Sequence, residues 1–431
     1  MAIFKPGKKK RVCVIGLDGV PHGMVLDLAG RGVMPAMGQL LASGRLHKMK
    51  ASLPEISAVS WTNFMTGTNP GTHGIFGFTD FKPGSYEIRF PNFLDMKAPT
   101  IWQTLADKGK TSVIINQPST YPARPVNGVL VSGFVALELS KAVYPLSRLA
   151  ALEKMGYRTD IDTLKSRRDP EFLWRELMGT LAGHEKAVDA FWDEPWDFFE
   201  FVITGTDRLH HFLWDAYADL SHPFHERFLA YYREVDRIVG KIAASFREST
   251  GTEKGLYILS DHGFTGIVQE VYLNAWLERN GYLGFEVPEP RGLEDVQASS
   301  RAFALDPNRI YLNLKGRFPK GSVHASERKG LLEEIARKLG TLEHDGRRVV
   351  RQVFFSEDIY SGPHTAAGPD LIVLGEPGFD MKGSAKKKVV FDRTDLQGMH
   401  TWDDAFFWAA GDHGPDLAIA DIAEIILENY A

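Results

Sequence analysis

Cysteine is nearly absent from this 431-residue chain, and its scarcity limits the kinds of site that the chain can build. The single cysteine, Cys13, excludes a disulfide framework and any metal cluster that relies on cysteine ligands. A metal site must therefore use histidine, carboxylate or hydroxyl groups, and the chain has 14 histidines.

Long apolar runs and an excess of basic charge are also lacking. No stretch of about 18 apolar residues occurs, so we expect no membrane-spanning helix. The 50 basic and 55 acidic residues give a net charge of −5, whereas proteins that bind nucleic-acid polymers are usually basic. The basic residues 1–11 precede only a short apolar run, which indicates a solvated tail and not a signal peptide. We therefore expect a cytoplasmic protein.

Short apolar runs alternate with helical patterns along most of the chain. The helical spacing is clear at residues 100–106 and 221–242. This alternation predicts an α/β fold with a largely parallel central sheet flanked by helices. The runs typical of strands buried on both faces lie at residues 12–17, 112–115, 129–131, 198–204, 256–259, 371–374 and 405–409.

Two longer segments interrupt this alternation. Residues 136–194 are mostly helical in pattern, and residues 274–388 mix a loop rich in proline and glutamate with strand and helix patterns. We expect residues 1–273 and 389–431 to form the core, which contains the helical insertion 136–194, and residues 274–388 to form a cap. The oligomeric state is not predicted.

Carboxylates and histidines directly follow three of the predicted strands. They are Asp18, Asp207 with His211 four residues later, and the pair Asp261 and His262. Each alone could be a helix cap or part of a turn. The carboxyl ends of parallel strands share one sheet edge, however, so these residues can converge there. Converging carboxylates repel each other, and a divalent cation is their natural counter-charge.

A cluster of hydroxyl residues, Ser57, Ser60 and Thr62, precedes a segment rich in glycine that reads TGTNPGTHG. A serine hydroxyl beside a divalent metal has a lowered pKa and can act as a nucleophile without a histidine base. Ser57 could instead be a helix N-cap, and the two roles can coexist because a helix N-terminus also favours a phosphate anion.

Taken together, GLDG, PEISAVSWTNFMTGTNPGTHGIFGF, TGTDRLHH, SDHGF and GMH resemble the alkaline phosphatase superfamily. Within it they are most similar to the type I phosphodiesterase/nucleotide pyrophosphatase family. The similarity extends to NAWLERNGYL and to the C-terminal IADIAEIILENY, so it covers most of the chain. It implies an alkaline-phosphatase-like core with inserted cap segments.

The resemblance also implies two divalent metal ions, most often zinc, with manganese or iron in some relatives. The family places its nucleophile nine residues before the threonine of a TG dipeptide, which favours Ser57 over Ser60. Its last histidine precedes a strand, which favours His400 over His413. The implied ligands are Asp18, Ser57, Asp261 and His262 for one ion, and Asp207, His211 and His400 for the other.

These features predict a metal-dependent phosphoester hydrolase that forms a phosphoenzyme at Ser57. A phosphodiester or pyrophosphate bond in a small nucleotide or lipid-linked substrate is expected, with contacts from Ser60, Trp61 and Asn63. The signature of sulfatases is absent after Ser57, which disfavours sulfate esters. A phosphomonoesterase, phosphonate hydrolase or phosphomutase with the same metals is the alternative. A non-catalytic protein that binds phosphorylated ligands is the alternative of another class.

Overall fold

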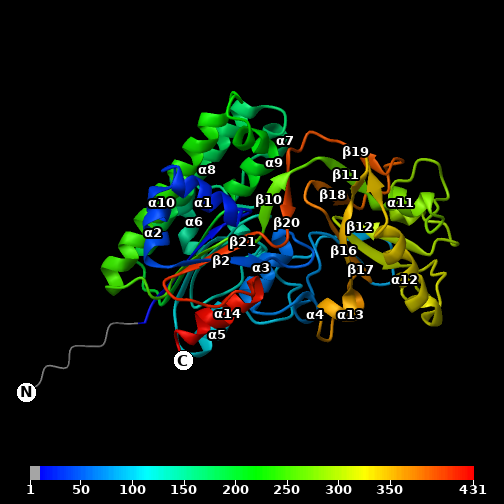
Figure 1. The fold of residues 1–431 in the computed structure, drawn as a ribbon. Helices are drawn as coiled ribbons and strands as arrows, with labels where there is room; N and C mark the ends of the chain where they lie inside the picture. The colour runs from blue at the N-terminus through cyan, green and yellow to red at the C-terminus, as the bar shows by residue number, and fades with distance from the viewer. Residues whose placement is uncertain (1–9) are drawn as a thin grey trace, which may run out of the picture. The chain divides into compact units, whose positions relative to one another are not determined.

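The computed structural model describes residues 10–431, so residues 1–9 of the basic N-terminal stretch lie outside the described part (Figure 1). The chain forms two compact units. Among the described residues, the first contains 10–68, 98–264 and 400–431, and the second contains Asn69–Lys97 and Thr265–Met399. The segment 69–97, which the sequence analysis assigned to the core, thus belongs to the second unit.

A nine-stranded sheet with the order β22-β2-β21-β9-β1-β8-β5-β6-β7 organises the first unit. Its five central strands, from β9 to β6, pair in parallel, which confirms the predicted fold class. Antiparallel pairs occur only toward its edges in the described chain, at β2–β21, β21–β9 and β6–β7. The strands are β1 Val12–Leu17, β2 Arg45–Lys50, β5 Ser112–Gln117, β6 Gly128–Ser132, β7 Val143–Tyr144, β8 Phe198–Ile203, β9 Leu256–Leu259, β21 Ala405–Ala409 and β22 Leu417–Ala418.

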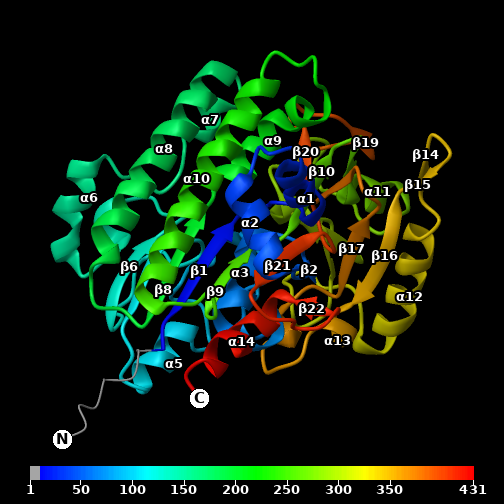
Figure 2. The same cartoon turned by 60° about the vertical axis from the view of Figure 1, so that its left-hand side comes forward.

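Helices cover both faces of this sheet (Figure 2). On one face, Ile15 and Phe201 join a large apolar core with residues from α8 and α10. On the other face, a side chain at Gly16 would collide with Trp61 of α3, so this helix lies directly over β1. The helices of the unit are α1 His22–Gly30, α2 Pro35–Ser43, α3 Ser57–Thr66, α5 Ile101–Asp107, α6 Leu149–Met155, α7 Thr163–Ser166, α8 Pro170–Trp192, α9 Gly205–Ala218, α10 His225–Thr250 and α14 Ile422–Glu428.

Local sequence signals explain where these helices begin and end. Thr100 and Gln103 form a reciprocal capping box at the start of α5, as expected from a threonine at that position. Helix α10 begins at His225, later than the expected residue 221, because Asp219 holds Ser221 in a tight turn. It ends at Gly251, whose φ of 75° suits glycine.

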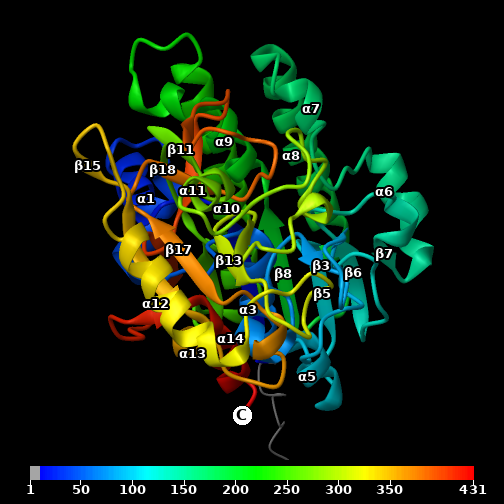
Figure 3. The same cartoon turned by 90° about the vertical axis from the view of Figure 1, so that its right-hand side faces the viewer.

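The second unit contains a main sheet of antiparallel strands and a smaller sheet in which β11 pairs in parallel with β18 and antiparallel with β19 (Figure 3). Its main sheet has the order β12-β13-β17-β16, and a smaller sheet has the order β18-β11-β19. The run 371–374, grouped above with the parallel strands, lies in β17 and pairs antiparallel with β13 and β16. Phe81 and Tyr86 belong to the apolar core of this unit, which explains why segment 69–97 is part of it.

The remaining elements complete this unit or carry the chain between the two units. They are α4 Pro70–His73, β3 Asp80–Phe81, β4 Ile88–Arg89, β10 Gly263–Gly266, β11 Gln269–Tyr272, α11 Leu273–Arg279, β12 Ala302–Leu305, β13 Arg309–Leu312, α12 Arg328–Leu339, β14 Glu343–His344, β15 Arg347–Arg348, β16 Val350–Phe355, α13 Ser356–Ile359, β17 Leu371–Gly375, β18 Phe379–Lys382, β19 Phe391–Asp392 and β20 Gly398–Thr401. Over the described residues 10–431, none of the helices has the length and apolar character needed to cross a membrane.

Candidate metal centre

Three adjacent parallel strands carry the acidic residues of the candidate site. Asp18 follows β1, Asp207 lies in the first turn of α9 after β8, and Asp261 follows β9. Strands β8, β1 and β9 are neighbours in the sheet, so their carboxyl ends bring these side chains to one edge. All three aspartates are buried, at 2%, 4% and 0% exposure, so water alone cannot neutralise their charge.

The first group of donor atoms surrounds the Nε2 atom of His262. This atom lies 3.2 Å from Ser57 Oγ and 3.3 Å from Asp261 Oδ2. Asp18 Oδ1 lies 3.7 Å from the same nitrogen and 3.4 Å from Ser57 Oγ. The structure thus brings together the four residues expected to share one ion.

The second group surrounds Asp207 Oδ1. His400 Nε2 lies 3.2 Å and His211 Nε2 lies 3.4 Å from this oxygen. The one-turn spacing on α9 places Asp207 and His211 on the same helix face, as their positions four residues apart predicted. The His400 ring stacks on the His262 ring with centroids 3.7 Å apart, so the two groups adjoin.

Ser57 is the first residue of α3, and this position decides how its hydroxyl is used. The N-cap is Ile56, and no side-chain cap hydrogen bond is present at this helix end. The Ser57 hydroxyl therefore contacts Asp18 and His262 and does not cap the helix. The hydroxyl of Ser60 instead contacts Ser52 in the interior, so Ser57 is the serine that reaches the carboxylates.

Each carboxylate has one oxygen held by a donor outside the cluster. Trp61 Nε1 donates to Asp18 Oδ2 at 2.9 Å, and the Gly19 amide donates to Asp261 Oδ1 at 3.0 Å. Arg208 donates to Asp207 Oδ2 at 2.9 Å. The opposite oxygens of Asp207 and Asp261 form no hydrogen bond with any described residue, although both are buried. The roles of Gly19 and Arg208 were not predicted from the sequence, and Trp61, expected to contact substrate, instead binds Asp18.

Backbone carbonyls orient two of the imidazole rings. His262 Nδ1 lies 3.0 Å from the Gly263 carbonyl, and His400 Nδ1 lies 2.8 Å from the Glu55 carbonyl. A carbonyl only accepts, so Nδ1 carries a proton in both rings, and Nε2 is the ring atom that faces the cluster. Metal-bound histidines commonly have this arrangement.

Burial and neighbouring charges shift the pKa values of the ionisable groups in the cluster away from their usual ranges. Burial and the neighbouring charges of Asp261 and Asp207 raise the pKa of Asp18 well above its usual range. Burial likewise raises the pKa of Asp261 to about 7 and lowers the pKa of His262. Buried carboxylates that face unprotonated imidazole nitrogens suit a divalent cation, which stabilises the charged carboxylate and the neutral imidazole.

The donor set fits such cations. In each of two groups the donor atoms lie within 4.8 Å of one another: Asp18, Asp261 and His262 form one, and Asp207, His262 and His400 form the other. Ser57 adjoins the first group and His211 the second. Oxygen and imidazole nitrogen donors of this kind suit zinc, manganese and iron.

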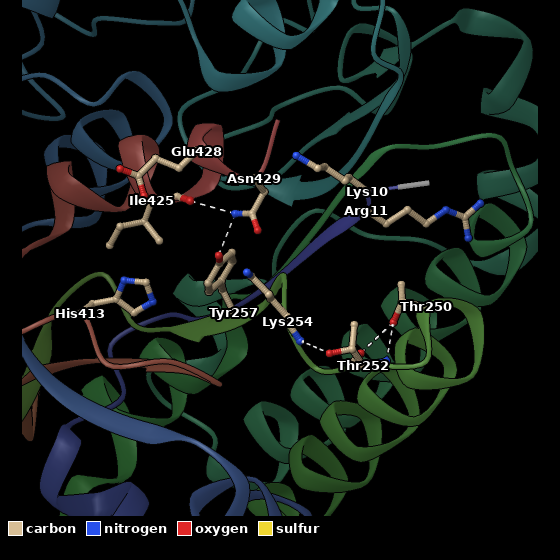
Figure 4. Close-up of a pocket in the computed structure, with 10 residues that line it drawn as sticks. All are labelled: Lys10, Arg11, Thr250, Thr252, Lys254, Tyr257, His413, Ile425, Glu428 and Asn429. Atoms are coloured by element: carbon tan, nitrogen blue, oxygen red, sulfur yellow. Dashed lines mark hydrogen bonds between the residues drawn. The ribbon is translucent and has the colours of Figure 1, made fainter. Parts of the chain in front are cut away.

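Other histidines considered for the site lie elsewhere. His413 lines a cavity of about 470 Å³ whose only carboxylate among the described lining residues is Glu428 (Figure 4). His210 adjoins His211 in sequence, but its ring contacts the Gly19 carbonyl and the Tyr232 hydroxyl. The structure therefore places His400, and not His413, beside Asp207.

The residues expected to contact substrate are buried. Ser60 and Trp61 have no exposed surface, and Asn63 is 7% exposed. The indole of Trp61 is committed to Asp18, and the hydroxyl of Ser60 to Ser52. Trp61 therefore supports Asp18, a candidate metal ligand, and Ser60 is part of the packing beneath α3.

Carboxylates and imidazoles meet beside a buried serine at one edge of the α/β sheet, a donor set that suits divalent metals. The chain matches the family model described as type I phosphodiesterase/nucleotide pyrophosphatase over residues 12–403. It therefore belongs to this family of metal-dependent hydrolases that act on phosphoester bonds. No curated protein matches the chain significantly in sequence.

Solved structures share the fold over nearly the whole chain. Phosphonoacetate hydrolase from Sinorhizobium meliloti, in complex with phosphonoformate, aligns with a TM-score of 0.63 and 15% identity, covering 98% of this chain and 96% of that one. Murine ectonucleotide pyrophosphatase/phosphodiesterase 5, in an inactive form with AMP, aligns with a TM-score of 0.57 and 13% identity, covering 97% of this chain and 94% of that one. These similarities confirm the alkaline-phosphatase-like fold.

Proposed function

We propose that this chain is a phosphodiesterase or nucleotide pyrophosphatase whose nucleophile is Ser57 and whose cofactor is a pair of divalent ions. One observation supports this most strongly. The Ser57 hydroxyl lies at the start of α3, takes no part in capping that helix, and contacts both Asp18 and His262. A serine hydroxyl on a buried carboxylate and an imidazole lone pair is poised to lose its proton when positive charge is nearby.

The residues would divide between the two ions as the donor groups suggest. Asp18, Ser57, Asp261 and His262 would hold one ion, and Asp207, His211 and His400 would hold the other. When bound, the ions would supply the positive charge that favours ionised Ser57 and stabilises the oxygens of the phosphoryl group. Zinc is the proposed metal because imidazole and carboxylate are its common ligands, and manganese and iron are the alternatives to test.

The chain's own residues would then carry out a two-step reaction. Ser57 gives up its hydroxyl proton and Oγ attacks phosphorus, the bond from phosphorus to the leaving oxygen breaks, and the leaving group departs with the electron pair and takes up a proton from solvent. Water next attacks the phosphoserine phosphorus, the bond to Oγ breaks, and Ser57 regains a proton. The amides at the N-terminus of α3 favour the anionic phosphoryl group during both steps.

A phosphonate hydrolase with the same residues is the second candidate. The structurally similar protein from Sinorhizobium meliloti is named for hydrolysis of phosphonoacetate, and the alignment with it covers 98% of this chain. Attack by a serine on phosphorus is common to both reactions, and they differ in whether the bond that breaks joins phosphorus to oxygen or to carbon. The choice therefore depends on the leaving group and is open to a direct assay.

The test is a panel of substrates with zinc, manganese or iron added to metal-free enzyme. The panel contains bis-p-nitrophenyl phosphate, p-nitrophenyl phosphate, a nucleoside triphosphate and phosphonoacetate. The proposal expects metal-dependent turnover that is fastest with the diester or the triphosphate. Faster cleavage of phosphonoacetate would instead support the second candidate, and faster cleavage of the monoester would support a phosphomonoesterase. Binding without turnover of any substrate would indicate a non-catalytic protein and overturn both proposals.

A further inference from the structure

Arg208 is a charged side chain beside the metal centre that neither the donor set nor the reaction uses. It follows Asp207 on α9, and its side chain is 11% exposed. The guanidinium packs over the Phe134 ring at 4.0 Å and donates to Asp207 Oδ2. Arginine is not a metal ligand, so its burial here requires another explanation.

Asp160 fixes the position of the guanidinium. Arg208 Nε lies 3.2 Å from both Asp160 oxygens, and Nη2 lies 2.8 Å from Asp160 Oδ2. This bidentate contact sets the plane of the guanidinium and leaves Nη1 directed at Asp207. Asp160 lies between α6 and α7, so it comes from the helical segment inserted between strands β7 and β8.

The contact determines which oxygen of Asp207 is available to a cation. Oδ2 is occupied by Arg208, whereas Oδ1 faces His211 and His400 and forms no hydrogen bond with a described residue. Asp207 can therefore offer a single, fixed oxygen between the two imidazoles. Without Arg208 the carboxylate could rotate and present either oxygen or both.

Asp160 also balances the charge of Arg208. An arginine with no counter-ion beside a metal ligand would repel a divalent cation. The carboxylate of Asp160 cancels this charge at hydrogen-bond distance, so Arg208 can orient Asp207 at little electrostatic cost.

We infer that Arg208 and Asp160 form a positioning pair, through which the inserted helical segment holds Asp207 as a one-oxygen ligand of the second ion. The inference rests on the proposed two-metal centre, and it assigns that segment a role in metal affinity. Arg208 touches neither substrate nor the reacting atoms in this account, and it acts through Asp207.

The test measures zinc affinity and not turnover. Zinc is titrated into metal-free protein against a competing chelator, and the binding step that disappears in His400→Ala identifies the Asp207 site. Arg208→Met is expected to weaken that step by about 10- to 100-fold, as is typical when a partner of a metal ligand is lost, and to leave the other step unchanged. Arg208→Lys keeps the charge but loses the bidentate contact with Asp160, so a smaller loss of zinc affinity is expected at the same step. Arg208→Lys also provides the test if Arg208→Met fails to fold.

Two further variants separate positioning from general stability. Asp160→Asn leaves the guanidinium without its counter-charge and is expected to weaken the same step. The control is Arg237→Met. Arg237 lies on α10 and donates through two guanidinium nitrogens to Glu185, and its loss is expected to leave both zinc-binding steps unchanged. Equal affinities in wild type and both Arg208 variants, or equal losses at both steps, would overturn the positioning role. Absence of zinc binding by the wild type would instead refute the two-metal proposal itself.

Discussion

The Nε2 atoms of His211 and His400 lie 3.1 Å apart, although the two residues are far apart in sequence. Neither side chain is fully exposed. His400 Nδ1 donates to the carbonyl of Glu55, so Nε2 is the atom that faces this contact. Asp207 Oδ1 is within 3.4 Å of both nitrogens. A divalent cation between these three atoms would stabilise the ionised carboxylate and could take both imidazole nitrogens as ligands.

The first prediction follows from this contact and concerns the choice between two histidines. His400→Ala should remove one of two bound ions, because it leaves Asp207 and His211 as the remaining donors of that group. His413→Ala should leave both ions in place, because that ring lies in a separate cavity with Tyr257 and Lys254 (Figure 4). Elemental analysis of the purified variants measures the difference. Loss of an ion from His413→Ala but not from His400→Ala would contradict the assignment.

The second prediction separates Ser57 from Ser60. Ser57→Ala should lower kcat by roughly 1,000-fold or more, because removing a nucleophile abolishes the covalent route. Its metal content should persist, since Asp18, Asp261 and His262 remain. The matched variant Ser60→Ala loses the contacts with Ser52, so it should cost about 1–2 kcal/mol of unfolding free energy and leave kcat nearly intact. Normal kcat in Ser57→Ala would reject the nucleophile.

The third prediction concerns Glu200, a buried acid in the middle of β8. Neither of its carboxylate oxygens has a hydrogen-bond partner among the described residues, and burial raises its pKa from 4.5 to about 8. The folded state therefore holds this proton while the unfolded chain releases it. The resulting stability is complete below about pH 4.5 and is lost as the pH rises to about 8, at up to about 1.4 kcal/mol per pH unit.

Urea unfolding at about pH 6 and about pH 8 tests this dependence. The unfolding free energy of Glu200→Gln minus that of wild type should rise between the two pH values, because glutamine does not titrate. Glu248→Gln, an exposed change on α10, provides the control and should show no such rise. Comparing variants removes the contributions of Asp18 and Asp261, which are shared. A constant difference for Glu200→Gln would contradict a raised pKa.

The parallel core and the ligand candidates were predictable because their signals are local. A run such as VCVIGL followed by Asp18 indicates both a buried strand and the sheet edge at which it ends. The spacing of Asp207 and His211 likewise indicated one face of a helix, which α9 provides. These features depend on short stretches of sequence and on general rules of parallel sheets.

Other features depend on contacts between distant segments and left no local signal. Arg208 and Asp160 are 48 positions apart, and nothing in TGTDRLHH distinguishes an arginine that binds a carboxylate from one in solvent. The burial of Trp61 against Asp18 is similarly a product of α3 lying over β1. The run at β17 was grouped with the parallel strands because an apolar run does not reveal its partner strand.

Anomalous X-ray diffraction at the zinc edge, from crystals of the wild-type protein grown with zinc, would show whether a pair of ions lies beside Ser57. Two adjacent peaks are expected, one contacted by Asp18, Ser57, Asp261 and His262, and one by Asp207, His211 and His400. Peaks located only away from these residues, or no peak near Ser57, would contradict a serine activated by a pair of metal ions.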